Sequence, residues 1–91
     1  MIKPNDLYIT EEEFDKIILD AEVEFMKERS KTPPENRKSC VQFWVKLTPA
    51  DIPVEYVYKL EESYVNAGWD NVQVVFVDDA PTKLMVYLSM D

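Results

Sequence analysis

Apolar residues recur at helical spacing along the first third of the chain. At about 100° per residue, one side of a helix would carry Phe14, Ile17, Ile18, Ala21 and Phe25. Thr10 and Glu13 have the spacing of a capping box, while Pro33 and Pro34 cannot continue a helix. The pattern therefore predicts a helix over residues 11–29, with this apolar stripe facing the core.

A second apolar stripe lies on the same predicted helix, well around the cylinder from the first. Leu19, Val23 and Met26 follow the spacing i, i+4, i+7. A helix that packs on a single surface would leave these three side chains in water. We therefore expect a partner to cover them.

Alternation of apolar and polar residues predicts three strands, over residues 40–47, 72–77 and 84–90, with a five-residue hairpin loop at 78–82 between the last two. The positions expected on the core face are Val41, Phe43, Val45, Leu47, Val72, Val74, Phe76, Leu84, Val86, Leu88 and Met90. The opposite face receives Trp44, Val75, Val77, Met85 and Tyr87. Both faces of the predicted sheet are thus apolar.

A second helix is expected between the first two strands. Its start is either the Thr48 to Asp51 segment or Pro53, because each offers a helix-starting signal. Its end is clearer, since Gly68 is the only glycine and suits a left-handed cap. Trp69 would then pack back on the helix.

The element order α-β-α-β-β indicates an α+β fold. The two strands around the second helix are expected to run parallel and the last strand antiparallel to its neighbour. This arrangement predicts a three-stranded mixed sheet, similar to a split β-α-β unit and packed by two helices. Residues 1–91 should form a single domain, with an exposed connector at about 30–39.

Three strands and two helices do not readily bury two apolar sheet faces and a two-sided helix. Either the helices divide between the two faces or a second chain contributes. We expect a homo-oligomer, with a two-fold dimer favoured. The sequence leaves open whether the second helical stripe or the second sheet face forms the interface.

Charge narrows the range of partners. Eighteen acidic and ten basic residues give a net charge of −8, which repels nucleic-acid phosphates and anionic membranes and attracts basic proteins. The first helix carries much of the acid, and we expect its interaction surface to consist of Glu12, Asp15, Glu22, Leu19, Val23 and Met26. The basic residues concentrate in and before the connector, at Lys27, Arg29, Lys31, Arg37 and Lys38.

Catalytic chemistry finds little support in the composition. The chain has no histidine, which removes the commonest general base and metal ligand, and one glycine cannot build a phosphate-binding loop. Cys40 is the only cysteine and is expected to be an ordinary buried thiol, while Asp78 and Asp79 suit a solvated turn. We therefore predict no enzyme activity, no cofactor and no metal site.

No apolar run is long enough to span a membrane, and the first residues lack the features of a signal peptide. A cytoplasmic protein is the simplest expectation. In compactness, acidity and lack of histidine the chain is similar to small accessory proteins of bacteriophages, several of which disable a host factor. This similarity is one of composition and covers no motif.

The leading hypothesis is a non-enzymatic, self-associating module that inhibits or regulates another protein. A first alternative is a protein that binds or sequesters a small anionic ligand or nucleotide between protomers, through Arg37, Lys38, Trp44 and Tyr87. A second alternative is a DNA mimic, which would require the acids of the first helix to lie on one surface.

Overall fold

The computed structural model describes residues 1–78 and 81–90. Its α-helices and strands, in chain order, are α1 (Glu11–Lys31), β1 (Cys40–Val45), α2 (Val54–Asn66), β2 (Asn71–Val77) and β3 (Lys83–Ser89). Short 3₁₀ turns at Pro4–Leu7 and Pro34–Asn36 precede and follow α1. The predicted α+β order is confirmed.

Helix α1 begins where its capping residue predicts. The hydroxyl oxygen of Thr10 accepts a hydrogen bond from the Glu13 backbone N–H at 3.1 Å. The helix continues to Lys31, two residues beyond the predicted end. Phe14 and Ile18 of the first stripe are buried, and the other members pack against the core from partly buried positions.

Helix α2 uses the later of its two possible starts. Pro53 is the N-cap, and the earlier segment forms a separate turn in which the Asp51 carboxylate accepts hydrogen bonds from the Thr48 N–H at 2.8 Å and hydroxyl at 3.1 Å. Gly68 follows the helix with a φ of 109°, so the left-handed cap is confirmed. The backbone N–H of Trp69 donates to the carbonyl of Tyr64 at 3.4 Å.

The sheet has the order β1-β3-β2 and is antiparallel throughout, so the predicted mixed sheet is wrong. Strands β1 and β2 do run in the same direction, but β3 lies between them and pairs with both. The physical reason lies in β3 itself. Leu84, Val86 and Leu88 form the most uniformly buried set of any of the three strands, which favours the central position with a neighbour on each side.

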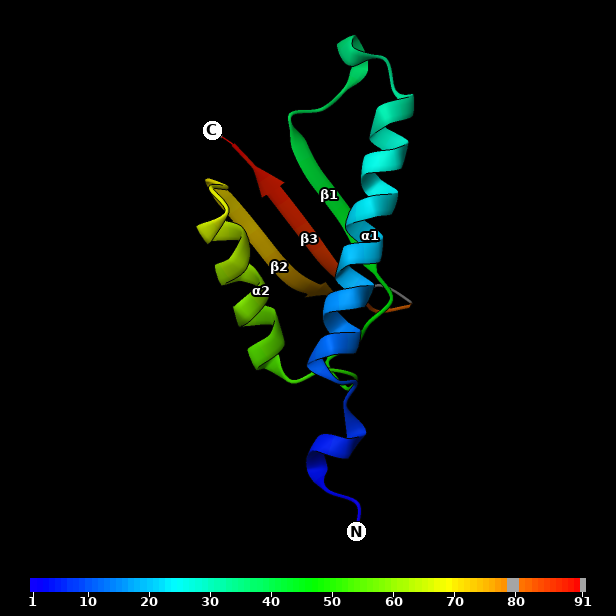
Figure 1. Ribbon diagram of the computed structural model, residues 1–91, viewed down its shortest axis with the longest axis vertical. Coiled ribbons are helices and arrows are strands. Elements are labelled where there is room, and N and C mark those ends of the chain that lie inside the picture. The colour runs from blue at the N-terminus through cyan, green and yellow to red at the C-terminus, as the bar shows by residue number, and fades with distance from the viewer. Residues whose placement is uncertain (79–80, 91) are drawn as a thin grey trace.

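Both helices lie on the same face of this sheet, as Figure 1 shows. Helix α1 packs against β1, and α2 packs against β2. The core between the layers consists of Phe14, Ile18, Phe43, Val45, Leu47, Ile52, Val57, Tyr64, Val74, Leu84, Val86 and Leu88. Met90, which was predicted to join it, is 55% exposed because it lies beyond the end of β3.

No helix among the described residues covers the second face of the sheet. The strand register places Cys40, Gln42, Trp44, Asn71, Gln73, Val75, Val77, Lys83, Met85, Tyr87 and Ser89 there, which we call the outer sheet face. The positions predicted for this face are confirmed. Trp44 is 51% exposed and Val75 is 45% exposed, so this apolar surface is only partly covered.

The molecule is elongated, with principal extents of 55 × 26 × 23 Å. The N-terminal segment extends from one end, and the last turns of α1 with the connector project at the other (Figure 1). The connector is largely exposed. In the hairpin loop, the Thr82 hydroxyl donates to Asp78 at 3.4 Å, while Asp79 lies outside the described residues. None of the helices in the described ranges is both long and apolar enough to cross a membrane.

We expect Leu84→Ala to lower the free energy of unfolding by about 2–5 kcal/mol, because it opens a cavity under the central strand. The matched variant is Leu19→Ala, the same change at a 57% exposed position, which should cost less than about 1 kcal/mol. Urea denaturation of both variants measures the difference. Equal losses would mean that β3 is not the centre of the core.

Candidate functional site

The second apolar stripe of α1 is exposed. Leu19, Val23 and Met26 are 57%, 47% and 56% exposed, so the prediction that the core leaves them uncovered is confirmed. The acids predicted to accompany them are Glu12, Asp15 and Glu22. We call the six residues together the docking face. At about 100° per residue they span the side of α1 that points away from the sheet and towards α2.

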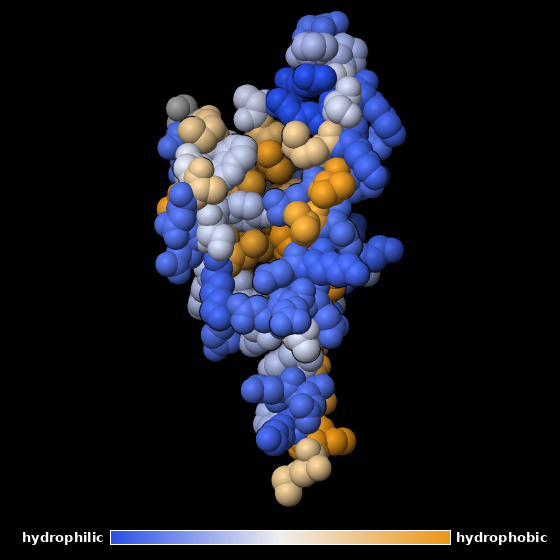
Figure 2. Space-filling model, in the orientation of Figure 1, coloured by the Kyte–Doolittle hydropathy of each residue, from blue (hydrophilic) through white to orange (hydrophobic). Residues whose placement is uncertain are grey.

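Apolar side chains gather along the strip between α1 and α2 in the space-filling view of Figure 2, and hydrophilic ones cover most of the surrounding surface. The two helices make a direct contact near the start of α1, where the Lys59 ammonium lies 3.1 Å from the Glu11 carboxylate. The rings of Phe14 and Tyr56 pack there with centroids 5.5 Å apart.

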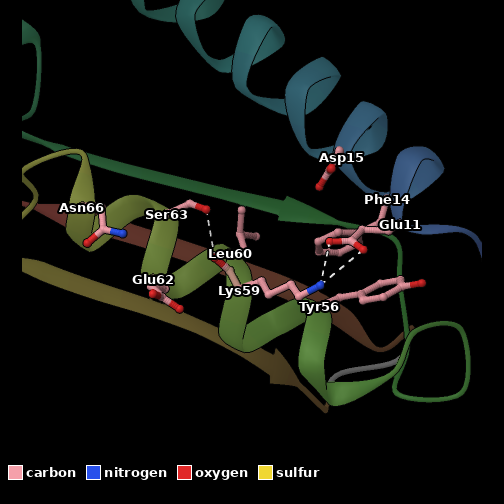
Figure 3. A pocket seen from close by; sticks show the side chains of 9 residues that line it. All are labelled: Glu11, Phe14, Asp15, Tyr56, Lys59, Leu60, Glu62, Ser63 and Asn66. Atoms are coloured by element: carbon pink, nitrogen blue, oxygen red, sulfur yellow. Dashed lines mark hydrogen bonds and ion pairs between the residues drawn. The ribbon is translucent and has the colours of Figure 1, made fainter.

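An acidic groove of about 350 Å³ lies at this contact, lined by Glu11, Phe14, Asp15, Tyr56, Lys59, Leu60, Glu62, Ser63 and Asn66 (Figure 3). Lys59 is paired with Glu11, but Asp15 and Glu62 have no ion pair within the described part of the chain. Three carboxylates therefore share one cation. Such a groove can accept a cationic side chain from a partner.

Glu22 links the docking face to the interior. It is half-buried, and desolvation raises the pKa of its carboxyl. The Tyr64 hydroxyl oxygen is buried and has no hydrogen-bond partner among residues 1–78 and 81–90. Burial, followed by the negative charge of Glu22, holds the pKa of Tyr64 well above its usual range. The two side chains are thus electrostatic neighbours across the α1–α2 strip.

A second, basic groove of about 420 Å³ lies at the far end of α1. It is lined by Phe25, Glu28, Arg29, Thr32, Asn36, Arg37, Lys38, Cys40, Gln42 and Trp44. The structure thereby brings together three of the four residues predicted for ligand binding: Arg37 and Lys38 from the connector and Trp44 from the edge strand β1. The fourth, Tyr87, lies outside the groove on β3, opposite Gln42.

Hydrogen bonds to the end of α1 hold this basic groove in shape. The Arg37 Nε donates to the carbonyl oxygens of Arg29 at 3.2 Å and Thr32 at 3.0 Å. The Arg29 Nη1 donates to the carbonyl of Lys38 at 3.4 Å. The connector is therefore fastened to the helix by the same arginines that give it charge.

Sequence reasoning missed parts of both grooves. It did not place Arg29 and Gln42 beside the ligand-binding candidates. The connector folds back against the end of α1, and local sequence patterns do not predict such a tertiary contact. It also missed the α2 wall of the acidic groove. The sequence could have predicted that wall, because one polar face of the second helix has the spacing i, i+3, i+4, i+7 at Lys59, Glu62, Ser63 and Asn66.

Both grooves have the chemistry of binding surfaces. Within the described ranges, no group of three or more carboxylate or thiol side chains could hold a metal ion. Cys40 is a half-buried free thiol in the basic groove rather than a fully buried core residue. It makes no hydrogen bond with any described base that would activate it as a nucleophile.

The chain matches no known family model, no curated protein sequence and no solved structure. Any function must therefore be argued from the side chains of these surfaces.

We expect Glu22→Gln to stabilise the protein at neutral pH but not in acid. Because the folded state raises the pKa of Glu22 above its usual 4.5, stability present below about pH 4.5 is lost as the pH rises through the folded-state pKa. Glutamine removes this loss. Urea midpoints of wild type and variant across this pH range measure the effect, with Glu12→Gln at an exposed position of α1 as the control. A pH-independent difference would rule out the burial of this carboxyl as its cause.

Proposed function

We propose that the protein is a non-enzymatic interaction module that binds another protein through the docking face of α1 and thereby inhibits or regulates it. The observation that carries the proposal is the exposure of Leu19, Val23 and Met26 along one stripe of a helix that is already packed by its opposite side. The partner surface should be apolar at its centre and basic around it.

The apolar stripe supplies the affinity. Each of its side chains is roughly half exposed, so covering it would contribute about 1 kcal/mol. Apolar side chains also gather between α1 and α2 (Figure 2). A helix or loop of the partner could lie along this strip and contact both α1 and α2.

The acids supply selectivity. Glu12, Asp15 and Glu22 have no ion pair with any described basic residue, so their charge is available to a partner. Asp15 also lines the acidic groove, which adds a position for a partner lysine or arginine (Figure 3). Exposed carboxylates such as those of Glu12 and Asp15 steer a basic partner before contact and reject acidic ones.

The DNA-mimic alternative has weaker support. At about 100° per residue, Glu12, Asp20 and Glu28 point in three different directions around α1. The acids therefore surround the helix instead of forming one ladder that resembles a phosphate backbone. The protein-binding proposal needs only the acids that flank the apolar stripe.

Self-association belongs to the same proposal, and the outer sheet face is the surface that suits it. In a chain with 28 charged residues, this face has a single one, Lys83. Two copies can meet there without bringing their acids together, and depletion of charge is typical of the centre of an interface. A two-fold dimer formed through β2 and β3 would cover Val75, Met85 and Tyr87 and leave the docking face and Trp44, on the edge strand β1, free.

The first experiment is affinity capture from nuclease-treated bacterial lysate. We expect a stoichiometric protein partner that is lost in the Glu12→Lys, Asp15→Lys double variant, because charge reversal removes both steering and pairing. The matched control is Glu35→Lys, Glu55→Lys, which changes the net charge equally at exposed positions outside the docking face. Equal capture by the two variants, or an association rate that does not fall with salt, would count against the docking face.

The second experiment is light scattering at micromolar concentrations. We expect a mass of twice 10.7 kDa for the wild type and a monomer for Val75→Asp, since a carboxylate at this position of the outer sheet face would be buried in the dimer without a partner. Val65→Asp, at a 56% exposed position of α2, should remain dimeric. A wild-type monomer would end this part of the proposal.

A further inference from the structure

We infer that the basic groove is a binding site for a small molecule that joins an anionic group to a planar ring, the chemistry of a nucleoside monophosphate. The groove contains no residue of the docking face, and the inference does not depend on the protein-binding proposal. It rests on three features: fixed guanidinium groups, cations without carboxylate partners, and an exposed indole in the same cavity.

The two arginines are held in place before any ligand arrives. The Nε of Arg37 donates hydrogen bonds to two carbonyl oxygens at the end of α1, which fixes the plane of the guanidinium. Both Nη groups have no described hydrogen-bond partner. Arg29 is tied through one Nη to the Lys38 carbonyl. A guanidinium with free, fixed donors is suited to hydrogen-bond a phosphate or carboxylate.

The cations of the groove remain unpaired in a protein rich in acid. Arg29, Arg37 and Lys38 line the cavity, and none of them forms an ion pair with any carboxylate in the described ranges. The one acid in the lining, Glu28, is paired with Lys31 at 3.5 Å. An anion that enters the groove would therefore meet three available positive charges.

The lining of the basic groove also contains aromatic side chains. Trp44 lines the groove and is 51% exposed, and Phe25 lies deeper, where it packs on Phe43 with ring centroids 6.4 Å apart. A half-exposed indole offers a face on which a planar ring can stack. Gln42 and Asn36 add side-chain amides that can hydrogen-bond the edge of such a ring.

The volume and the charge of the protein limit the ligand. A cavity of about 420 Å³ lies within the usual range for small-molecule sites, and it suits one nucleotide better than a chain of them. The net charge of −8 repels a long polyanion more strongly than a single phosphate group. These two facts favour a small molecule over a nucleic-acid strand.

The test uses Trp44 as its own reporter. The chain has two tryptophans, so Trp69→Phe leaves Trp44 as the only indole. Titration of this variant with adenosine monophosphate should quench its fluorescence to saturation. Lys38→Glu, at a side chain with no described hydrogen bond of its own, should weaken binding about tenfold or more, because it removes one charge-assisted contact and adds a repulsion. Lys46→Glu, an equal charge change on an exposed lysine outside the groove, should not.

Separate ligands test the contribution of the planar ring and that of the anionic group. Adenosine and inorganic phosphate should each bind more weakly than adenosine monophosphate. In isothermal titration, Trp44→Leu should weaken the binding of adenosine monophosphate and leave the binding of inorganic phosphate unchanged. Four results would overturn the inference: no quenching at millimolar ligand, equal effects of the two lysine variants, phosphate binding as tightly as the nucleotide, or an oligonucleotide binding much more tightly than the mononucleotide.

Discussion

The burial of β3 is the constraint on which the rest of the structure depends. Leu84 and Val86 have no exposed surface and Leu88 has 3%, because a strand pairs with β3 on each side and both helices cover this face. The chain has two long helices, and both are used for this single face (Figure 1). The outer sheet face and the far side of α1 therefore carry apolar side chains that no element among the described residues covers. The candidate interaction surfaces are thus a consequence of how the core is built.

Charge is divided along α1 in a way that separates the two grooves. The start of the helix carries Glu11, Glu12, Glu13 and Asp15, where carboxylates also stabilise the positive end of the helix dipole. The end carries Arg29 and Lys31 and receives the guanidinium of Arg37 on its free carbonyls. Charges that stabilise the two ends of one long helix therefore also create an acidic site at one end and a basic site at the other, about 30 Å apart for a helix of this length.

Local signals predicted most of the fold. The Thr10 cap, the Gly68 cap and the two-residue alternation of the strands each depend on near neighbours, so the sequence contained the necessary information. The order of the strands did not follow in the same way, because it depends on which strand is buried most completely. The density of apolar residues in β3, with Leu84, Val86 and Leu88 at alternate positions, could have indicated the central strand, but β1 and β2 alternate almost as well.

The same difference between local signals and tertiary arrangement applies to the candidate sites. Exposure of the second α1 stripe was predictable, since a helix cannot bury both sides against one sheet. The basic groove was predictable only in its members Arg37, Lys38 and Trp44, because its shape depends on hydrogen bonds between the connector and residues eight or nine positions earlier in α1. Those bonds have a further implication. The Nε of Arg37 donates to carbonyl oxygens at the end of α1, so only its Nη groups are available to a ligand. A ligand that fixes this guanidinium would therefore also stabilise the last turn of α1. Ligand binding at the basic groove would therefore be thermodynamically linked to order in the connector.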